Sequence, residues 1–183
     1  RGELTVVLGG GAMGLLHLLV LRALDPDASV VVSEPRADRR ALARTLGAVA
    51  AVEPADALAS AVLDLTRGEG AAACFDTVGG AEVLRQGLAL LRPGGAVVLF
   101  AHAPAGEHAA FELNPLFKHE LRVLATYSGG LGEQRLAAEL IGSGRLDASP
   151  LVSHRLPLES FATAVELVRR GEALKVILLG RVG

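Results

Sequence analysis

The chain has 183 residues, and its hydrophobic content of 51% is enough to build the core of a single domain. A formal net charge of −2 and an aromatic content of 3% exclude the basic surface and stacking platform of a nucleic-acid-binding protein. The apolar runs are too short to span a membrane, residues 1–3 do not resemble a secretory signal, and Cys74 has no partner for an internal disulfide. We therefore expect a cytoplasmic protein that binds neither membranes nor nucleic acid.

The first predicted elements are a buried strand at Leu4–Leu8, a glycine turn, and a helix that continues through the apolar residues 15–24. This order is typical of the phosphate end of a dinucleotide site, because the helix N-terminus presents unpaired N–H groups and the positive end of its dipole. Gly9 would permit the tight turn, Gly11 would let the backbone approach a pyrophosphate, and Gly14 would let the helix pack on its strand. We assign the following turn residues to cofactor binding: Gly9, Gly11, Ala12, Met13 and Gly14.

The second predicted strand, Ser29–Ser33, is followed by Glu34, twenty residues after Gly14. In a β-α-β unit that binds a dinucleotide, a carboxylate at this point accepts hydrogen bonds from the hydroxyls of the adenosine ribose. A glycine motif alone is weak evidence, but here strand, turn, helix, second strand and acid are all in register. The pattern therefore predicts that the chain binds NAD or NADP.

The choice between these two cofactors depends on the charges around Glu34. Its carboxylate would repel the 2′-phosphate of NADP, which favours NAD. Guanidinium groups close by would instead attract that phosphate, and three arginines follow: Arg36, Arg39 and Arg40. We predict NAD as the cofactor, with NADP as the less favoured alternative.

Beyond Glu34, helices alternate with short apolar strands, which predicts a doubly wound Rossmann sheet of about six parallel strands. The turn Pro93-Gly94-Gly95 is expected to lead into the fifth of these strands. The expected helices are 36–46, 55–66, 81–91 and 133–141, and the expected strands are 48–52, 71–77, 96–100 and 121–126.

After residue 144 the alternation changes, with an extended segment at 151–156, a helix at 159–170 and a last strand at 175–179. We do not expect this tail to join the Rossmann sheet. The predicted domains are therefore an NAD(P)-binding Rossmann domain at residues 1–145 and a C-terminal segment at residues 146–183.

The chain resembles the cofactor-binding half of the medium-chain, zinc-type alcohol dehydrogenases, nearest the branch of sorbitol, threonine and cyclitol dehydrogenases. The resemblance covers almost the whole chain, and its motifs together are far more specific than the glycine turn alone. They lie at residues 6–16, 31–35, 39–40, 46–48, 91–95, 143–146, 151–158 and 174–177.

The resemblance implies further cofactor contacts, most of them where later strands end at the carboxyl edge of the sheet. They are Arg39 on the adenosine, Thr77 and Val78 on the nicotinamide riboside, Ala101 and His102 at the nicotinamide, Ser128 on the cofactor amide, and Lys175 on the pyrophosphate.

Plainer roles stay open for several residues of this edge. Asp76 can cap the turn after its strand. His102 titrates near neutrality and so suits a proton relay, but it can also line the cleft without moving a proton. Ser128 can start a turn, and Lys175 can be a solvated lysine at a strand edge.

Members of this family carry, as the resemblance implies, an N-terminal GroES-like catalytic domain of roughly 150 residues that holds the catalytic zinc. That domain is missing here, since Arg1 falls one residue before the glycine that usually opens the first Rossmann strand. Cys74 and the five histidines show no zinc-ligand spacing, and Cys74 is expected to be a small buried hydrophobe. We therefore expect no catalytic residue and no metal site in this chain, with zinc only in the missing domain.

Three functions follow from these patterns. The favoured one is the NAD-binding domain of a zinc-dependent alcohol or polyol dehydrogenase, inactive by itself, with a small alcohol as substrate of the complete enzyme. The alternatives are the cofactor domain of a zinc-free NADPH quinone or enoyl reductase and a non-catalytic nucleotide-sensing module. In the favoured case the C-terminal segment packs toward the catalytic domain, and the Rossmann sheet mediates homo-oligomer formation.

Overall fold

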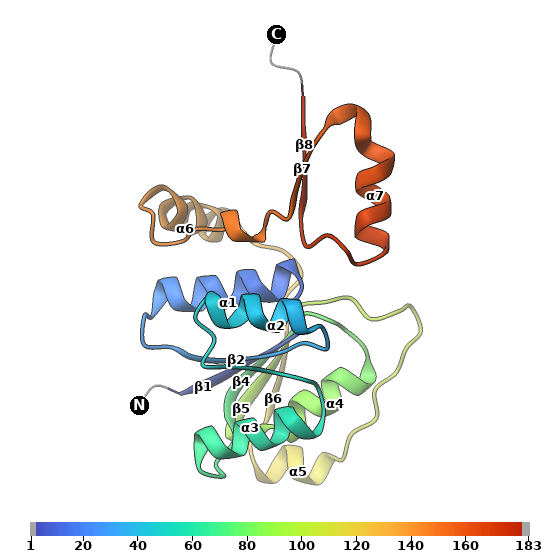
Figure 1. Cartoon of the computed structure of the whole chain (residues 1–183). Coiled ribbons are helices and arrows are strands. Elements are labelled where there is room, and N and C mark those ends of the chain that lie inside the picture. Colours follow the sequence, from blue (N-terminus) through green and yellow to red (C-terminus); the bar gives the residue numbers. More distant parts are fainter. Residues whose placement is uncertain (1–2, 181–183) are drawn as a thin grey trace.

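The computed structural model describes residues 3–180, so Arg1 and the outermost residues of both predicted domains lie outside the described part. The described chain forms a six-stranded sheet in the order β3-β2-β1-β4-β5-β6, with every neighbouring pair parallel (Figure 1). This order and the parallel pairing confirm the predicted Rossmann sheet. The strands are β1 (Leu4–Leu8), β2 (Ser29–Ser33), β3 (Ala50–Val52), β4 (Ala71–Asp76), β5 (Leu91–Leu99) and β6 (Arg122–Ala125).

Helices cover the sheet on both faces, as the alternation of elements predicts. Figure 1 shows α1 and α2 on one face and α3 and α4 on the other. The helices are α1 (Ala12–Leu24), α2 (Ala37–Thr45), α3 (Asp56–Thr66), α4 (Ala81–Ala89), α5 (Leu113–Lys118), α6 (Leu131–Gly142) and α7 (Phe161–Arg169).

The side chains of β1 alternate between two apolar clusters. Val6 belongs to the cluster that contains Leu58 of α3. Val7 points to the opposite face and packs in the cluster that contains Leu15 and Leu18 of α1. Because a central strand of this kind is buried on both faces, its sequence is a continuous apolar run. These two clusters fix the position of the turn that follows β1.

Strand β5 differs from its prediction. It begins at Leu91 rather than at residue 96, so the segment Pro93-Gly94-Gly95 lies inside the strand. The pairing register with β4 shifts between Ala71 and Ala73, and Gly94 has a φ of +74°. A bulge of this kind accommodates a proline and glycines that would otherwise end a strand.

Two other segments depart from the expected elements. The short helix α5 was not predicted, and its Pro115 lies in the first turn, where a missing N–H costs no helical hydrogen bond. The extended segment expected at 151–156 is shorter than predicted, because residues 149–151 form a 3-10 turn and the strand begins only at His154.

The chain ends in a small unit that does not join the Rossmann sheet, as expected. Strands β7 (His154–Pro157) and β8 (Val176–Leu179) form a separate parallel pair, and α7 connects them. We call β7, α7 and β8 the C-terminal unit (Figure 1). Leu151, which precedes this unit, belongs to the cluster of Leu15 and Leu18, and Leu174, between α7 and β8, packs against that cluster, so the tail is anchored on α1.

No helix in the described residues is both long enough and apolar enough to cross a membrane.

Candidate functional site

The carboxyl ends of β1, β2 and β4 meet at the glycine turn. The N–H of Gly9 donates to the carbonyl of Ser33 over 2.8 Å, which ties the turn to the end of β2. The backbone N–H and the hydroxyl of Thr77 both donate to the carbonyl of Leu8, at 3.1 and 2.8 Å. The predicted residues of the turn and Thr77 are therefore brought together at one edge of the sheet.

The surroundings of positions 9 and 14 leave no room for a residue larger than glycine. Gly9 has a φ of +101°, and a Cβ on it would lie 2.7 Å from the hydroxyl oxygen of Thr77. A Cβ on Gly14 would lie only 1.8 Å from the carbonyl oxygen of Gly9. These contacts match the predicted turn and helix-packing roles of the two glycines.

Gly11 faces open space instead. Apart from Gly11 itself and its two chain neighbours, no described residue has an atom within 4 Å of the point where its Cβ would be. Gly11 is also the N-cap of α1, and it provides no side-chain hydrogen bond to the first N–H groups of this helix. With Ala12 and Met13 it forms an uncapped helix N-terminus beside free space, an arrangement that can hold an anionic group such as a pyrophosphate.

Glu34 lies at the same edge and is only 4% exposed. Its Oε2 accepts the N–H of Gly10 and its Oε1 accepts the N–H of Arg36, both at 2.9 Å. Each carboxylate oxygen retains a second acceptor position. The acid is therefore held in one orientation beside the turn and can still accept further hydrogen bonds.

The three arginines after Glu34 are all engaged with other groups. Arg36 donates two hydrogen bonds to Asp38. This pairing lowers the pKa of the Asp38 carboxyl and raises the pKa of the Arg36 guanidinium. Arg40 donates to the carbonyl of Glu34 at 2.9 Å and pairs with Glu53 at 2.9 Å. Arg39 donates over 3.1 Å to the carbonyl of Gly171, at the end of α7.

Asp76, the last residue of β4, connects the turn that follows β4 with the segment that follows β5. Its Oδ1 accepts the N–H groups of Val78 and Gly79, at 2.9 and 2.7 Å. Its carbonyl accepts those of Phe100 and Ala101, both at 3.0 Å. Asp76 thus caps the turn, the alternative that the sequence left open. Its Oδ2 is buried without a hydrogen-bond partner in the part of the chain described here.

The segment after β5 lies directly against this turn. A Cβ on Gly79 would lie 2.4 Å from the carbonyl oxygen of His102. The ring of His102 makes an edge contact with the ring of Tyr127, with centroids 5.7 Å apart. A cavity of about 600 Å³ opens here, lined in part by Val78, His102 and Glu107. Val78 and His102 therefore lie together at the ends of β4 and β5, and Ala101 lies beside Gly79. The predicted cofactor contact of Ser128 stays a prediction.

Lys175 lies apart from these residues. It precedes β8 in the C-terminal unit, and its carbonyl accepts the N–H groups of Ser153 and His154. Its side chain is exposed. Neither Lys175 nor Arg39 has a side-chain contact with the glycine turn among those the structure records. Their predicted cofactor contacts stay predictions, as do those of the residues at the edge of the sheet.

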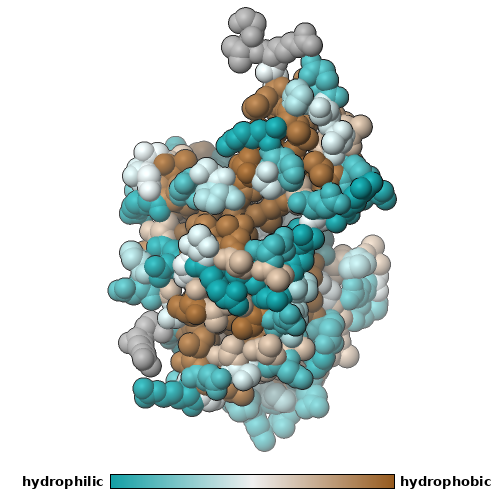
Figure 2. Space-filling model, viewed as in Figure 1, coloured by the Kyte–Doolittle hydropathy of each residue, from teal (hydrophilic) through white to brown (hydrophobic). Residues whose placement is uncertain are grey.

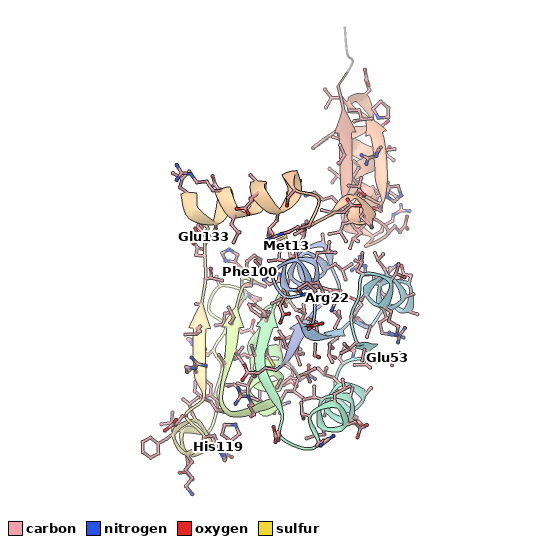
Figure 3. All side chains as sticks on the ribbon, turned by 90° about the vertical axis from the view of Figure 1, so that its left-hand side faces the viewer. Met13, Arg22, Glu53, Phe100, His119 and Glu133 are labelled. Atoms are coloured by element: carbon pink, nitrogen blue, oxygen red, sulfur yellow. The ribbon has the colours of Figure 1, made fainter. Side chains whose placement is uncertain are left out.

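Sequence reasoning missed one feature of the edge. Gly10 was given no role, although its N–H binds Glu34. His17, one of the five histidines without zinc-ligand spacing, has its Nδ1 2.8 Å from the carbonyl oxygen of Met13, and its ring packs against Phe75 and Phe100. In Figure 3, Met13 and Phe100 lie toward the end to which the strands point, and His119 lies at the opposite end. The run of three glycines was the available signal for Gly10.

The described residues do not fit a zinc site. Among residues 3–180, no group of three or more His, Cys, Asp or Glu side chains is arranged to hold a metal ion. Cys74 is fully buried in β4, and this burial raises the pKa of its thiol from 9.0 to about 12.

We predict that thiol reagents do not modify Cys74 in the folded protein at pH 8, because the reactive species is the thiolate and the sulfur is inaccessible. A chromogenic disulfide reagent should detect no thiol under native conditions and one equivalent in guanidinium chloride, since the sequence holds a single cysteine. Rapid modification of the native protein would show that β4 opens, or that Cys74 is not buried.

The family follows from comparison with known proteins. A family model described as zinc-binding dehydrogenase matches residues 12–143. The chain belongs to the zinc-binding dehydrogenase family. This result confirms the resemblance from which several of the predicted contacts were taken, and the matched region includes residues 12–14, Glu34 and the ends of β4, β5 and β6.

The relatives that this chain matches are about twice its length. It is 33% identical over 185 residues to L-threonine 3-dehydrogenase of Thermococcus kodakarensis, a match that covers 100% of this chain and 52% of the relative. The alcohol dehydrogenase TADH from Thermus sp. ATN1 is 30% identical with a TM-score of 0.91, and the match covers 99% of this chain and 52% of that one. The chain therefore spans about half the length of the relatives it matches.

One solved structure of the family contains a nicotinamide cofactor. It comes from Sinorhizobium meliloti 1021 and is described as a zinc-binding dehydrogenase bound to NADP. It is 30% identical to this chain with a TM-score of 0.81, and the match covers 90% of this chain and 48% of that one.

Proposed function

We propose that this chain is the NAD-binding domain of a zinc-dependent alcohol or polyol dehydrogenase. The observation that carries the proposal is the pairing of Glu34 with the uncapped N-terminus of α1, beside the open space at Gly11. A fixed carboxylate and an uncapped helix end, side by side, suit a ribose next to a pyrophosphate. The relatives named as alcohol and threonine dehydrogenases support the same class of reaction.

The residues of this chain would bind and orient the cofactor. The first turn of α1 would hold the pyrophosphate, Glu34 would accept the ribose hydroxyls, and the turns at Val78 and His102 would flank the nicotinamide. Bound NAD would supply the hydride acceptor. The alcohol and its metal would be held by the domain that makes up the other half of the relatives.

The contacts of the arginines support NAD over NADP. A 2′-phosphate would lie close to the Glu34 carboxylate, and two of the three neighbouring guanidinium groups already pair with a carboxylate, Arg36 with Asp38 and Arg40 with Glu53. The NADP-bound relative is the reason to test this preference directly.

We expect the purified chain to bind NAD more tightly than NADP and to contain no stoichiometric zinc. Calorimetric titration with each cofactor measures the preference, and metal analysis of the same sample measures zinc. NADP binding that equals or exceeds NAD binding would contradict the assignment of Glu34. Absence of binding to either cofactor would contradict the proposed function itself.

We further propose that the two domains are those predicted from the sequence, with residues 146–183 packing toward the catalytic domain. Exposed apolar side chains on the C-terminal unit support a partner surface there, and Figure 2 shows hydrophobic surface over this part of the molecule. They are Leu158, Phe161, Val165, Val168 and Leu179.

A second copy of the chain is proposed as the partner of the sheet edge at β6. All four residues of this strand are exposed, including Val123 and Leu124, and its outer backbone groups pair with no further strand of the described sheet. An unpaired strand edge of this kind can form backbone hydrogen bonds with the same edge of a second copy of the chain.

Light scattering should therefore report a dimer, and Leu124→Lys should shift it toward monomer because two lysines would face each other across the new strand pair. Leu63→Lys is the matched control, since Leu63 is similarly exposed but lies on α3. A wild-type chain that stays monomeric at high concentration would count against this assembly.

A further inference from the structure

The segment that follows β5 is fixed where it begins. The N–H groups of Phe100 and Ala101 donate to the carbonyl of Asp76. Residues 102–107, which come next, form no helix or strand and are exposed. The N–H of Glu107 donates to the carbonyl of Pro104 over 3.1 Å, and Gly106 has a φ of +82°, so the segment ends in a tight turn. This turn needs a contact outside the segment to hold it in place.

Glu107 supplies that contact. Its Oε1 accepts the N–H of Ala81, the first residue of α4, over 2.7 Å. Within the part of the chain that the structure describes, this is the only recorded hydrogen bond between residues 102–107 and any other segment. Without the Glu107 carboxylate, no recorded hydrogen bond would connect the turn at its end to α4.

The start of α4 has no cap of its own. Its N-cap is Gly80, which has no side chain to accept the first N–H groups of the helix. Glu82, in the first turn, is paired with Arg85 instead. A carboxylate binds well at such a position, because the helix N-terminus is the positive end of the dipole. The Glu107 carboxylate therefore lies where α4 needs an acceptor.

The cavity of about 600 Å³ lies between the two segments that this hydrogen bond joins. One wall includes Val78 and the first turn of α4, and the other includes His102 and Glu107. The walls touch near Gly79, where a Cβ would lie 2.4 Å from the carbonyl oxygen of His102. The bond from Glu107 to α4 joins them a second time, further along the segment. The position of the second wall thus depends on Glu107.

We infer that Glu107 is a positioning residue: by capping α4, its carboxylate holds residues 102–107 beside the cavity and so orders the nicotinamide ring. The inference rests on the proposed function, because it concerns one end of the same cofactor site. Neither Glu34 nor the first turn of α1 has a recorded contact with Glu107 in the described chain. Loss of the Glu107 contact should therefore loosen the nicotinamide and leave the rest of the cofactor bound as before.

The test compares Glu107→Ala with wild type in titrations with NADH and with ADP-ribose, which lacks the nicotinamide. The emission of NADH at saturation reports the mobility and solvation of the nicotinamide ring, and the chain has no tryptophan to interfere. Wild type should raise this emission above that of free NADH. Glu107→Ala should lose most of the gain, because loss of a cap lowers the population of the held segment by up to about fivefold. The dissociation constant of ADP-ribose should stay within about twofold of wild type.

Two further variants separate the contact from the charge of Glu107. Glu107→Gln keeps an oxygen that can accept the N–H of Ala81, so it should restore most of the NADH emission. Glu112→Ala is the matched control, since Glu112 is another exposed acid after β5 whose side chain makes no recorded hydrogen bond in the described chain. Its NADH emission and its ADP-ribose affinity should match those of wild type.

Any of four outcomes would overturn the inference. They are a wild-type chain that binds NADH without a gain in emission, wild-type emission in Glu107→Ala, a glutamine variant no better than the alanine variant, and an equal change in Glu112→Ala. Loss of ADP-ribose binding in Glu107→Ala would also overturn it, because Glu107 would then support the fold rather than the nicotinamide. Failure of the proposed function gives a different result, since wild type would bind neither NADH nor ADP-ribose.

Discussion

Replacing Glu34 with serine is expected to weaken NAD binding by about 1–3 kcal/mol, the range for hydrogen bonds to a charged group. The carboxylate is 4% exposed and fixed by two backbone N–H groups, so it is already oriented before any cofactor arrives. A serine hydroxyl is too short to reach the same position. NADP binding should be unchanged or stronger, because a negative charge near its 2′-phosphate is removed.

The matched control for this change is Glu53→Ser. Glu53 is also an acid close to the arginines and pairs with Arg40, but its side chain is 65% exposed and makes no recorded contact with the glycine turn. Its loss removes the same charge and should leave NAD affinity within about 0.5 kcal/mol of wild type. Equal losses in the two variants would mean that general electrostatics, and not ribose binding, explain the effect of Glu34.

Much of the Rossmann sheet was predictable because local signals and tertiary packing agree there. The apolar runs at β1 and β2 are buried on both faces, and their observed bounds are the predicted ones. The glycine turn and Glu34 were found by spacing alone, since β1, α1 and β2 pack in a geometry that fixes the number of residues between them. The position of the site at the carboxyl edge of the sheet was predicted from the same pattern.

The parts that escaped prediction depend on contacts that local sequence does not reveal. Pro93 and Gly94 usually end a strand, and they lie inside β5 because Leu91 and Ala96, on either side of them, pair with β4. The contact of Arg39 with Gly171 joins residues far apart in the chain, so no local sequence pattern predicts it. The role of Gly10 follows from the approach of two turns in space, which the spacing of the motif does not encode.

Gly14→Ala is expected to destabilise the fold and to abolish cofactor binding together. The new Cβ would lie 1.8 Å from the carbonyl oxygen of Gly9, so α1 must move away from the turn that follows β1. Overpacking of this severity belongs at the upper end of the usual range, about 3 kcal/mol. For a chain of this length the loss corresponds to a fall in Tm of roughly 6–12 °C.

The measurement is thermal unfolding followed by circular dichroism, with and without NAD, and Gly132→Ala is the matched control. Gly132 is the second residue of α6, and apart from its chain neighbours and the nearby backbone of the helix no described atom lies within 4 Å of its Cβ position, so alanine there should keep the stability within about 0.5 kcal/mol of wild type. Wild type should show a higher Tm with NAD, because a ligand that binds only the folded state stabilises it, and Gly14→Ala should show no such rise. A Gly14→Ala chain with wild-type Tm and an intact NAD shift would mean that α1 does not pack on the turn as closely as the Gly9 to Gly14 contact requires.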